Sequence, residues 1–132
     1  MATERLMVLL IEHDEAFARA VSGMLDQARD TVGAVVTTAS LDEAIAKLST
    51  EKFDVILLEL FLPDGAGLLN ISLLKEQAPR VPVIVIGAVD DETLALEAVH
   101  VGAQDYLVKG QLSPRWLLRS IRYTSERHEA DM

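Results

Sequence analysis

Short apolar runs alternate along the chain with segments in which apolar residues recur every three or four positions. Runs of this length, bounded by turn residues, are typical of strands that are buried on both faces of a sheet. The run at 32–38 is β-branched and less uniformly apolar, which favours a place near the sheet edge. The five predicted strands are residues 6–11, 32–38, 55–59, 83–86 and 106–108.

Helix start signals stand between these runs. Asp14 can cap a helix, and Ser40 with Glu43 forms a capping-box pattern in which the two side chains bond backbone amides. Ser113 followed by Pro114 combines a cap with a proline at the first helical position. The predicted helices begin at Asp14, Ser40, Gly67, Asp90 or Asp91, and Ser113; the fourth ends at Gly102 and the last runs through Arg127.

Five strands that alternate with five helices predict a parallel sheet covered on both faces, with right-handed crossovers. The pattern resembles that of flavodoxin-like (βα)5 three-layer sandwiches, and this resemblance implies a five-stranded sheet in the order 2-1-3-4-5. This order would place the strands that end at Glu12, Glu59 and Lys109 beside one another, so that two carboxylates and one ammonium share a crevice. Residues 1–127 form the predicted domain, and 128–132 are predicted to be a polar tail or the start of a helical linker.

Composition narrows the functional classes. The chain of 132 residues carries a formal net charge of −9 and no cysteine. An acidic protein repels nucleic acid and anionic membranes, so we expect neither direct nucleic-acid binding nor membrane association. The lack of cysteine excludes disulfides and thiol chemistry, and the apolar run at 6–11 is too short for a signal peptide or a membrane span. These features favour a cytoplasmic protein.

One carboxylate ends the most apolar run. Glu59 follows four consecutive apolar residues, and a turn containing Pro63, Asp64 and Gly65 comes soon after it. In open α/β sheets, ligands and chemistry gather at the carboxyl ends of the strands. Glu59 is therefore the candidate centre of the functional site.

Three segments, at 8–12, 54–67 and 102–109, resemble the receiver domain of bacterial two-component response regulators, and the likeness extends over 5–127. In that family a histidine kinase passes a phosphoryl group to an aspartate at the end of the third strand. Two acids after the first strand help to hold Mg²⁺, a Ser or Thr after the fourth strand contacts the phosphoryl group, and a lysine follows the fifth strand. The resemblance implies a signalling partner, either a histidine kinase or an effector domain.

This sequence matches only some of the residues that carry the phosphotransfer chemistry in this family. Glu12 matches the first acid and Lys109 matches the lysine, whereas His13 replaces the second acid. Glu59 stands at the phosphoacceptor position, and Gly87 at the hydroxyl position. Glutamate is one methylene longer than aspartate, and phosphoryl transfer depends on positioning, so the exchange should be costly.

We therefore predict a degenerate, phosphorylation-independent receiver that acts as an interaction module and is not an enzyme. It requires no cofactor, and Mg²⁺ should bind at Glu12 and Glu59 weakly or not at all, because Mg²⁺ prefers oxygen ligands and His13 offers nitrogen. Glu59 then serves either as a fixed phosphate mimic or as a structural partner of Lys109.

Three alternatives stay open. The first is a working phosphoacceptor receiver that uses Glu59 or His13 with Mg²⁺. The second is a transition-metal site formed by His13, Glu12 and Glu59, whose ligand types are plausible. The third is a flavodoxin-like binder of a small ligand, although no glycine-rich phosphate loop follows the first strand.

The resemblance also implies a switch and an interaction surface. In the family, the aromatic residue of the fifth strand, here Tyr106, turns inward when the hydroxyl residue moves. Gly87 leaves that space open, so we expect Tyr106 to be buried and turned toward Gly87 without phosphorylation. Receivers commonly dimerise through the fourth helix, fifth strand and fifth helix, which predicts a partner or homodimer face. The residues expected on that face are Trp116, Arg119, Arg122 and Tyr123.

Overall fold

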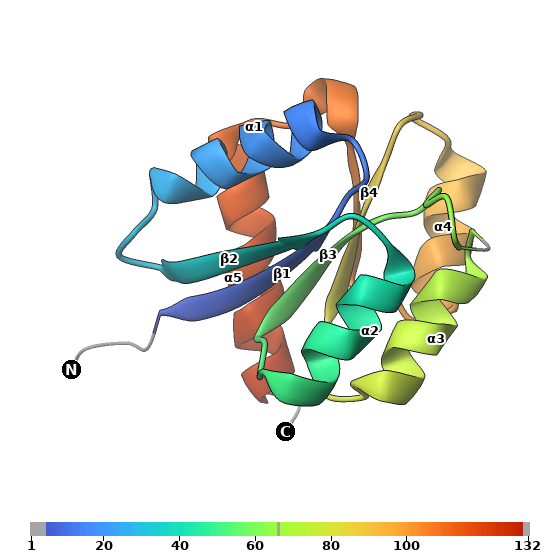
Figure 1. Ribbon diagram of the computed structural model, residues 1–132. Helices are drawn as coiled ribbons and strands as arrows, with labels where there is room; N and C mark the ends of the chain where they lie inside the picture. The colour runs from blue at the N-terminus through green and yellow to red at the C-terminus, as the bar shows by residue number, and fades with distance from the viewer. Residues whose placement is uncertain (1–4, 66, 131–132) are drawn as a thin grey trace.

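A five-stranded parallel sheet in the order β2-β1-β3-β4-β5 lies between two helical layers (Figure 1). The computed structural model describes residues 5–65 and 67–130, with side chains as far as residue 126. This architecture confirms the flavodoxin-like fold. The strands are β1 (Leu6–Ile11), β2 (Val32–Thr38), β3 (Val55–Glu59), β4 (Val83–Gly87) and β5 (Asp105–Val108). The helices are α1 (Glu15–Asp26), α2 (Leu41–Thr50), α3 (Leu69–Gln77), α4 (Glu92–His100) and α5 (Pro114–Ala130), with a 3-10 turn at Lys109–Gln111.

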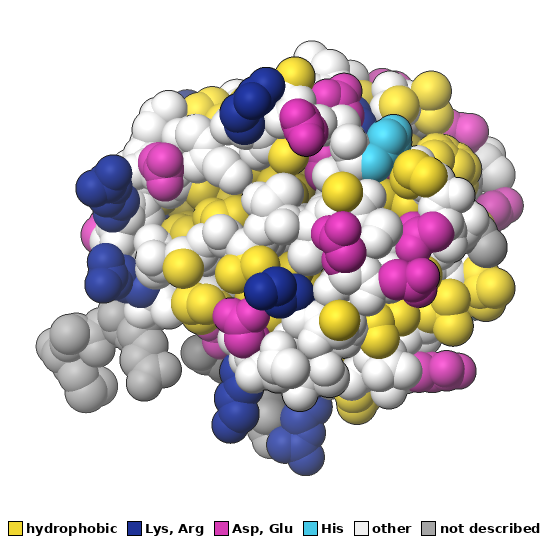
Figure 2. All heavy atoms as spheres, in the orientation of Figure 1, with side chains coloured by type: hydrophobic (Ala, Val, Ile, Leu, Met, Phe, Trp, Pro, Cys, Tyr) yellow, Lys and Arg dark blue, Asp and Glu magenta, His cyan; other side chains and the backbone are white. Residues whose placement is uncertain are grey.

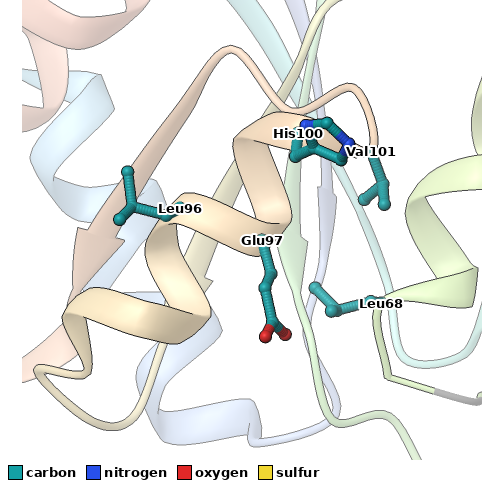
Figure 3. Close-up of a pocket in the computed structure, with 5 residues that line it drawn as sticks. All are labelled: Leu68, Leu96, Glu97, His100 and Val101. Atoms are coloured by element: carbon teal, nitrogen blue, oxygen red, sulfur yellow. The ribbon is translucent and has the colours of Figure 1, made fainter.

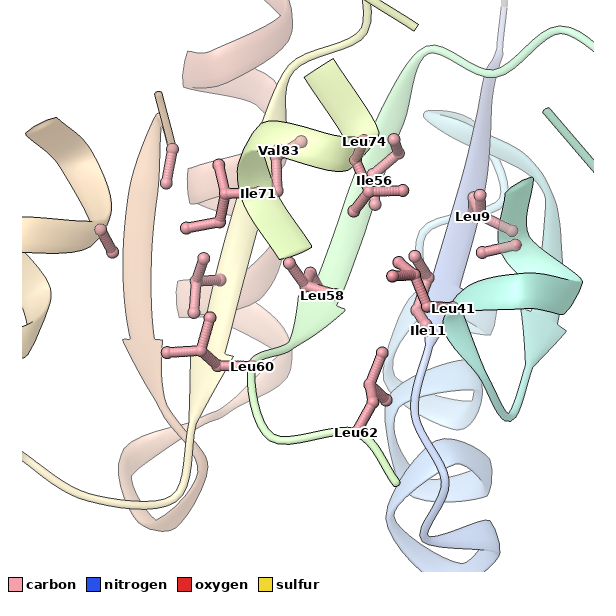
Figure 4. Packing of buried hydrophobic residues seen from close by; sticks show 14 of the residues in the cluster. Leu9, Ile11, Leu41, Ile56, Leu58, Leu60, Leu62, Ile71, Leu74 and Val83 are labelled. Atoms are coloured by element: carbon pink, nitrogen blue, oxygen red, sulfur yellow. The ribbon is translucent and has the colours of Figure 1, made fainter. Parts of the chain in front are cut away.

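Alternate residues of the central strand β3 supply the two halves of the core. Ile56 and Leu58 pack into a cluster with side chains of α2, α3 and α4 (Figure 4). Val55 and Leu57 face the opposite cluster, which contains side chains of α1 and α5. All four side chains are fully buried, and each contributes about 1.5–3 kcal/mol of apolar burial. A slip of one residue would exchange the side chains of the two faces and would move Glu59 from its position at the end of the strand.

The expected helix caps are present. Asp14 accepts a hydrogen bond from the amide of Phe17 at 3.2 Å, and Ser40 accepts one from Glu43 at 3.2 Å. At the start of the fourth helix Asp91, rather than Asp90, is the cap. The Ser113 hydroxyl likewise accepts from the amide of Trp116 at 3.2 Å.

A second cap on α2 was not anticipated. The carboxylate of Asp64, in the loop after β3, accepts hydrogen bonds from the amides of Leu41 at 2.9 Å and Asp42 at 3.1 Å. These bonds lower the pKa of Asp64, with the Leu41 amide contributing most. The loop that follows Glu59 is therefore tied to the first turn of a helix that precedes it in the chain.

Two helix boundaries differ from the prediction. α3 begins at Leu69 rather than at Gly67, because Gly67 has a φ of 60°, in the left-handed region that interrupts a right-handed helix. α5 continues to Ala130, three residues past the predicted end at Arg127. The start of the expected polar tail is thus helical, and 131–132 lie outside the described residues. None of the described helices is long and apolar enough to cross a membrane.

Candidate functional site

One ammonium joins two carboxylates at the carboxyl edge of the sheet. Glu12 directly follows β1, Glu59 is the last residue of β3, and Lys109 directly follows β5. The Lys109 Nζ atom lies 2.7 Å from Glu59 Oε2 and 3.1 Å from Glu12 Oε1. The sequence therefore predicted this group correctly, but β4 lies between β3 and β5, so the three strands are not all neighbours. Lys109 reaches Glu59 past the end of β4.

Each of the two carboxylates also accepts a hydrogen bond from a backbone amide. The amide of Asp14 donates to Glu12 Oε1 at 3.1 Å, and the amide of Phe61 donates to Glu59 Oε1 at 3.2 Å. Each amide lies two residues after the carboxylate that it binds, in the loop that leaves the strand. The loops therefore orient both side chains inward, toward Lys109.

The two acidic side chains of the site are almost completely buried. Glu12 is 2% exposed and Glu59 is 3% exposed, whereas the side chain of Lys109 is about one-fifth exposed. Burial raises the pKa of the Glu12 carboxyl; the hydrogen bond from Lys109 opposes this rise, and the charge of Glu59 adds to it. Burial acts to lower the pKa of Lys109, but contacts with Glu59 and then Glu12 outweigh it and the pKa is raised. The group carries two negative charges and one positive charge when all three are ionised.

An aromatic ring supports the ammonium from the α1 side. The Lys109 Nζ atom lies 4.6 Å from the centroid of the Phe17 ring, within the range of a cation–π contact. Phe17 lies in the first turn of α1, and the sequence contains no signal that its ring meets a lysine far along the chain. Such a contact depends on how α1 is seated against the sheet.

The arrangement does not fit a metal ion. His13 is exposed and does not join the buried carboxylates, so it adds no ligand to Glu12 and Glu59. Both acids already contact the Lys109 ammonium, which occupies the space between them. Across the described part of the chain, no three His, Cys, Asp or Glu side chains are grouped to hold a metal. The geometry therefore gives no support to the transition-metal site of His13, Glu12 and Glu59, and weak or absent binding of Mg²⁺ stays a prediction.

The Tyr106 ring lies against Gly87. A Cβ atom built on Gly87 would lie 2.5 Å from the ring Cζ atom and 3.0 Å from Cε2, so the ring fills the space of a side chain at this position. The phenol donates a hydrogen bond to the carbonyl of Val89 at 2.9 Å. The orientation is the expected one, but the ring is half-buried rather than buried. A role for this pair as a switch stays a prediction.

The residues of the expected interaction face separate into two groups. Trp116, Arg119 and Tyr123 line one shallow hollow beside β5, with the Arg119 guanidinium 5.3 Å from the Trp116 ring. Trp116 and Tyr123 are more than half exposed. Arg122 does not line this hollow, because its guanidinium donates to the Thr31 hydroxyl at 2.8 Å, in the loop before β2. Arg122 thus lies apart from the other three residues, and its part in an interaction face stays a prediction.

Comparison with known proteins identifies the family to which this chain is similar. The family model for the response regulator receiver domain matches residues 8–122. The chain is 39% identical over 103 residues to the transcriptional regulatory protein KdpE of Staphylococcus aureus (strain NCTC 8325 / PS 47), which covers 77% of this chain and 42% of that protein. It is 35% identical over 128 residues to the KDP operon transcriptional regulatory protein KdpE of Escherichia coli (strain K12). This match covers 93% of this chain and 52% of that protein. The chain spans about half the length of these curated relatives.

Solved structures show the same fold. A response regulator receiver domain protein from Methanospirillum hungatei JF-1 superimposes with a TM-score of 0.85 at 22% identity, covering 98% of this chain and 100% of that chain. The beryllofluoride-activated NtrC4 receiver domain dimer superimposes with a TM-score of 0.82 at 30% identity. The match covers 92% of this chain and 98% of that chain.

Proposed function

The chain belongs to the response regulator receiver domain family of two-component signalling, and we propose that its output does not depend on phosphorylation. In this proposal it works as an interaction module and not as an enzyme. Its partner is a histidine kinase or an effector domain, and the acidic domain makes no direct contact with nucleic acid. A cytoplasmic location, expected from the sequence, stays a prediction.

The state of the Glu59 carboxylate supports this proposal most strongly. Its Oε1 atom accepts the Phe61 amide, and its Oε2 atom is paired with the Lys109 ammonium. An acceptor carboxylate must present an oxygen in line with the phosphorus atom, with cations free to stabilise the transferred charge. Here each oxygen of Glu59 already has a partner, the ammonium is already paired with carboxylates, and the Glu59 carboxylate is almost wholly shielded from solvent.

The residues around Glu59 also support an output that does not depend on phosphorylation. Gly87 offers no hydroxyl to a phosphoryl oxygen, and the Tyr106 ring fills the adjacent space. His13 is exposed and leaves the second acidic position of the family without a carboxylate. The fixed charge of Glu59, held on Lys109, takes the place of a phosphoryl group as the partner of that lysine. The protein would therefore remain in one signalling state until a partner binds it.

Acetyl phosphate with Mg²⁺ tests the proposal directly. Intact mass spectrometry should show no added phosphoryl group on the natural protein after an incubation that phosphorylates a receiver with the usual site. The triple variant Glu59→Asp, His13→Asp, Gly87→Thr restores the family's acceptor, second acid and hydroxyl, and serves as a control from the same chain. A hydroxylamine-sensitive adduct on Glu59, or an adduct on His13, would establish the alternative of an unusual phosphoacceptor.

A further inference from the structure

A second apolar surface lies on the other helical layer from α5. The start of α3 and the second half of α4 enclose an open hollow of about 490 Å³, lined by Leu68, Leu96, Glu97, His100 and Val101 (Figure 3). Leu96 is 69% exposed and Val101 is 38% exposed. Clusters of exposed aliphatic side chains on a single domain mark interaction sites more often than isolated ones do.

Glu97 is the acid among the side chains that line this hollow, and none of the lining residues is a lysine or an arginine. Between residues 81 and 108 the sequence contains five acids and no lysine or arginine. Figure 3 shows the Glu97 side chain extending from α4 on the side where Leu68 lies. Figure 2 shows acidic and apolar side chains intermixed over the side of the molecule where α3 and α4 lie, while most of the visible Lys and Arg side chains lie toward the opposite and lower edges.

The nearest lysine of α3 does not neutralise this surface. The stem of Lys75 packs near Gly102, and its ammonium donates to the carbonyl of Val81 at 3.4 Å. Burial lowers the pKa of Lys75. The hollow also lies at the carboxyl end of α4, which terminates at His100, where the helix dipole carries partial negative charge. Both the side chains and the backbone therefore favour a cationic partner.

We propose that this hollow binds an amphipathic helix of a partner protein, with aliphatic side chains against Leu68, Leu96 and Val101 and a lysine or arginine beside Glu97. Recognition of this kind places apolar residues spaced three and four apart into a groove and leaves the charged rim to select the partner. The surface is separate from the Trp116 hollow, since α5 packs on the opposite face of the sheet. This inference holds whether or not Glu59 accepts a phosphoryl group.

The test uses a synthetic probe peptide of about 14 residues, with leucine on one helical face and lysine on the others. A shuffled peptide of the same composition, without the apolar face, is its control. Amide chemical shifts of the full chain and fluorescence anisotropy of a labelled peptide report binding. We expect shifts centred on Leu68, Glu97 and Val101, and we expect the shuffled peptide to bind at least about tenfold more weakly, equivalent to about 1.4 kcal/mol.

Variants separate the hollow from the bulk charge of the protein. Glu97→Lys and Leu96→Asp should each weaken binding about tenfold, whereas Glu126→Lys, the same charge change on the opposite layer, should weaken it less than about twofold. Both α4 positions are exposed, so the variants should unfold at the same urea concentration as the natural protein. Equal losses for Glu97→Lys and Glu126→Lys, shifts centred on Trp116, or no binding would overturn the proposal. A change in sedimentation caused by Leu96→Asp alone would overturn it too, by identifying a second copy of this chain as the occupant.

Discussion

The Tyr106 ring occupies the volume that a side chain at Gly87 would need, with the ring Cζ atom 2.5 Å from an ideal Cβ position. The two residues lie on neighbouring strands, at the edge where Glu59 and Lys109 meet. Any residue other than glycine on β4 at this point must therefore displace the ring. The absence of a side chain at one position thus determines the rotamer at another.

Gly87→Ala and Gly87→Thr should expel the Tyr106 ring and break its hydrogen bond to Val89. We expect a loss of about 1–3 kcal/mol in the free energy of unfolding, from the steric conflict and the lost bond. Ring NMR signals should shift toward those of a solvent-exposed tyrosine. Gly23→Ala is the matched control: its Cβ would meet nothing within 4 Å, and it replaces a helical glycine, so stability should rise by up to about 1 kcal/mol. A Tyr106 ring that keeps its environment in Gly87→Thr would contradict the steric account.

Lys109→Met should destabilise the fold strongly, because it leaves two buried carboxylates without a counter-charge. Breaking one partner of a buried ion pair costs about 3–5 kcal/mol, and urea unfolding measures this loss. Adding Glu59→Gln should restore part of it, since one of the uncompensated charges is then removed. Lys47→Met is the control, because its pair with Glu51 is exposed and contributes about 1 kcal/mol or less. Equal losses in the free energy of unfolding for the two lysine variants would show that the buried ion pairs of Lys109 stabilise the fold no more than an exposed pair does.

Glu12 should give the protein a distinctive dependence on pH. Burial raises its pKa above 4.5 in the folded state, so the folded protein binds the proton more tightly than the unfolded chain does. The contribution of this group to stability is therefore fully present below the unfolded pKa and is lost as pH rises through the folded pKa. Relative to Glu12→Gln, the natural protein should gain stability as pH falls across that window, measured by urea unfolding. A difference that grows with rising pH would show that Glu12 is stabilised as the anion.

Arg119→Glu should weaken self-association or partner binding, since the guanidinium lies over Trp116 within the hollow beside β5. We expect a several-fold loss of affinity that shrinks as salt is added, because a charge at the rim acts mainly through long-range attraction. Arg122→Glu makes the same charge change three residues away, on a side chain directed to Thr31, and should have a much smaller effect. Sedimentation velocity over a range of protein and salt concentrations tests both variants. Equal losses would mean that the net charge of α5, and not this hollow, governs association.

The sequence by itself determined the elements and the chemistry at their ends. Each apolar run bounded by turn residues became a strand, fully buried in β3 and β4, and parallel strands have their carboxyl ends at one edge of the sheet. Glu12, Glu59 and Lys109 therefore had to meet once the fold was identified. The sequence also placed Glu59 and Gly87 where the family resemblance implies an aspartate and a hydroxyl residue, because these positions are fixed relative to the strands.

Only the tertiary structure decided which side chains reach across between elements. The Asp64 carboxylate caps α2, the Phe17 ring supports Lys109, and Arg122 turns toward Thr31, over separations of 22 to 92 positions along the chain. Hydrophobic period reports which face of an element is buried, but it carries no information about how far two elements slide or rotate against each other. That packing sets where a long side chain ends, and so it places the contacts on which the site and its surfaces depend.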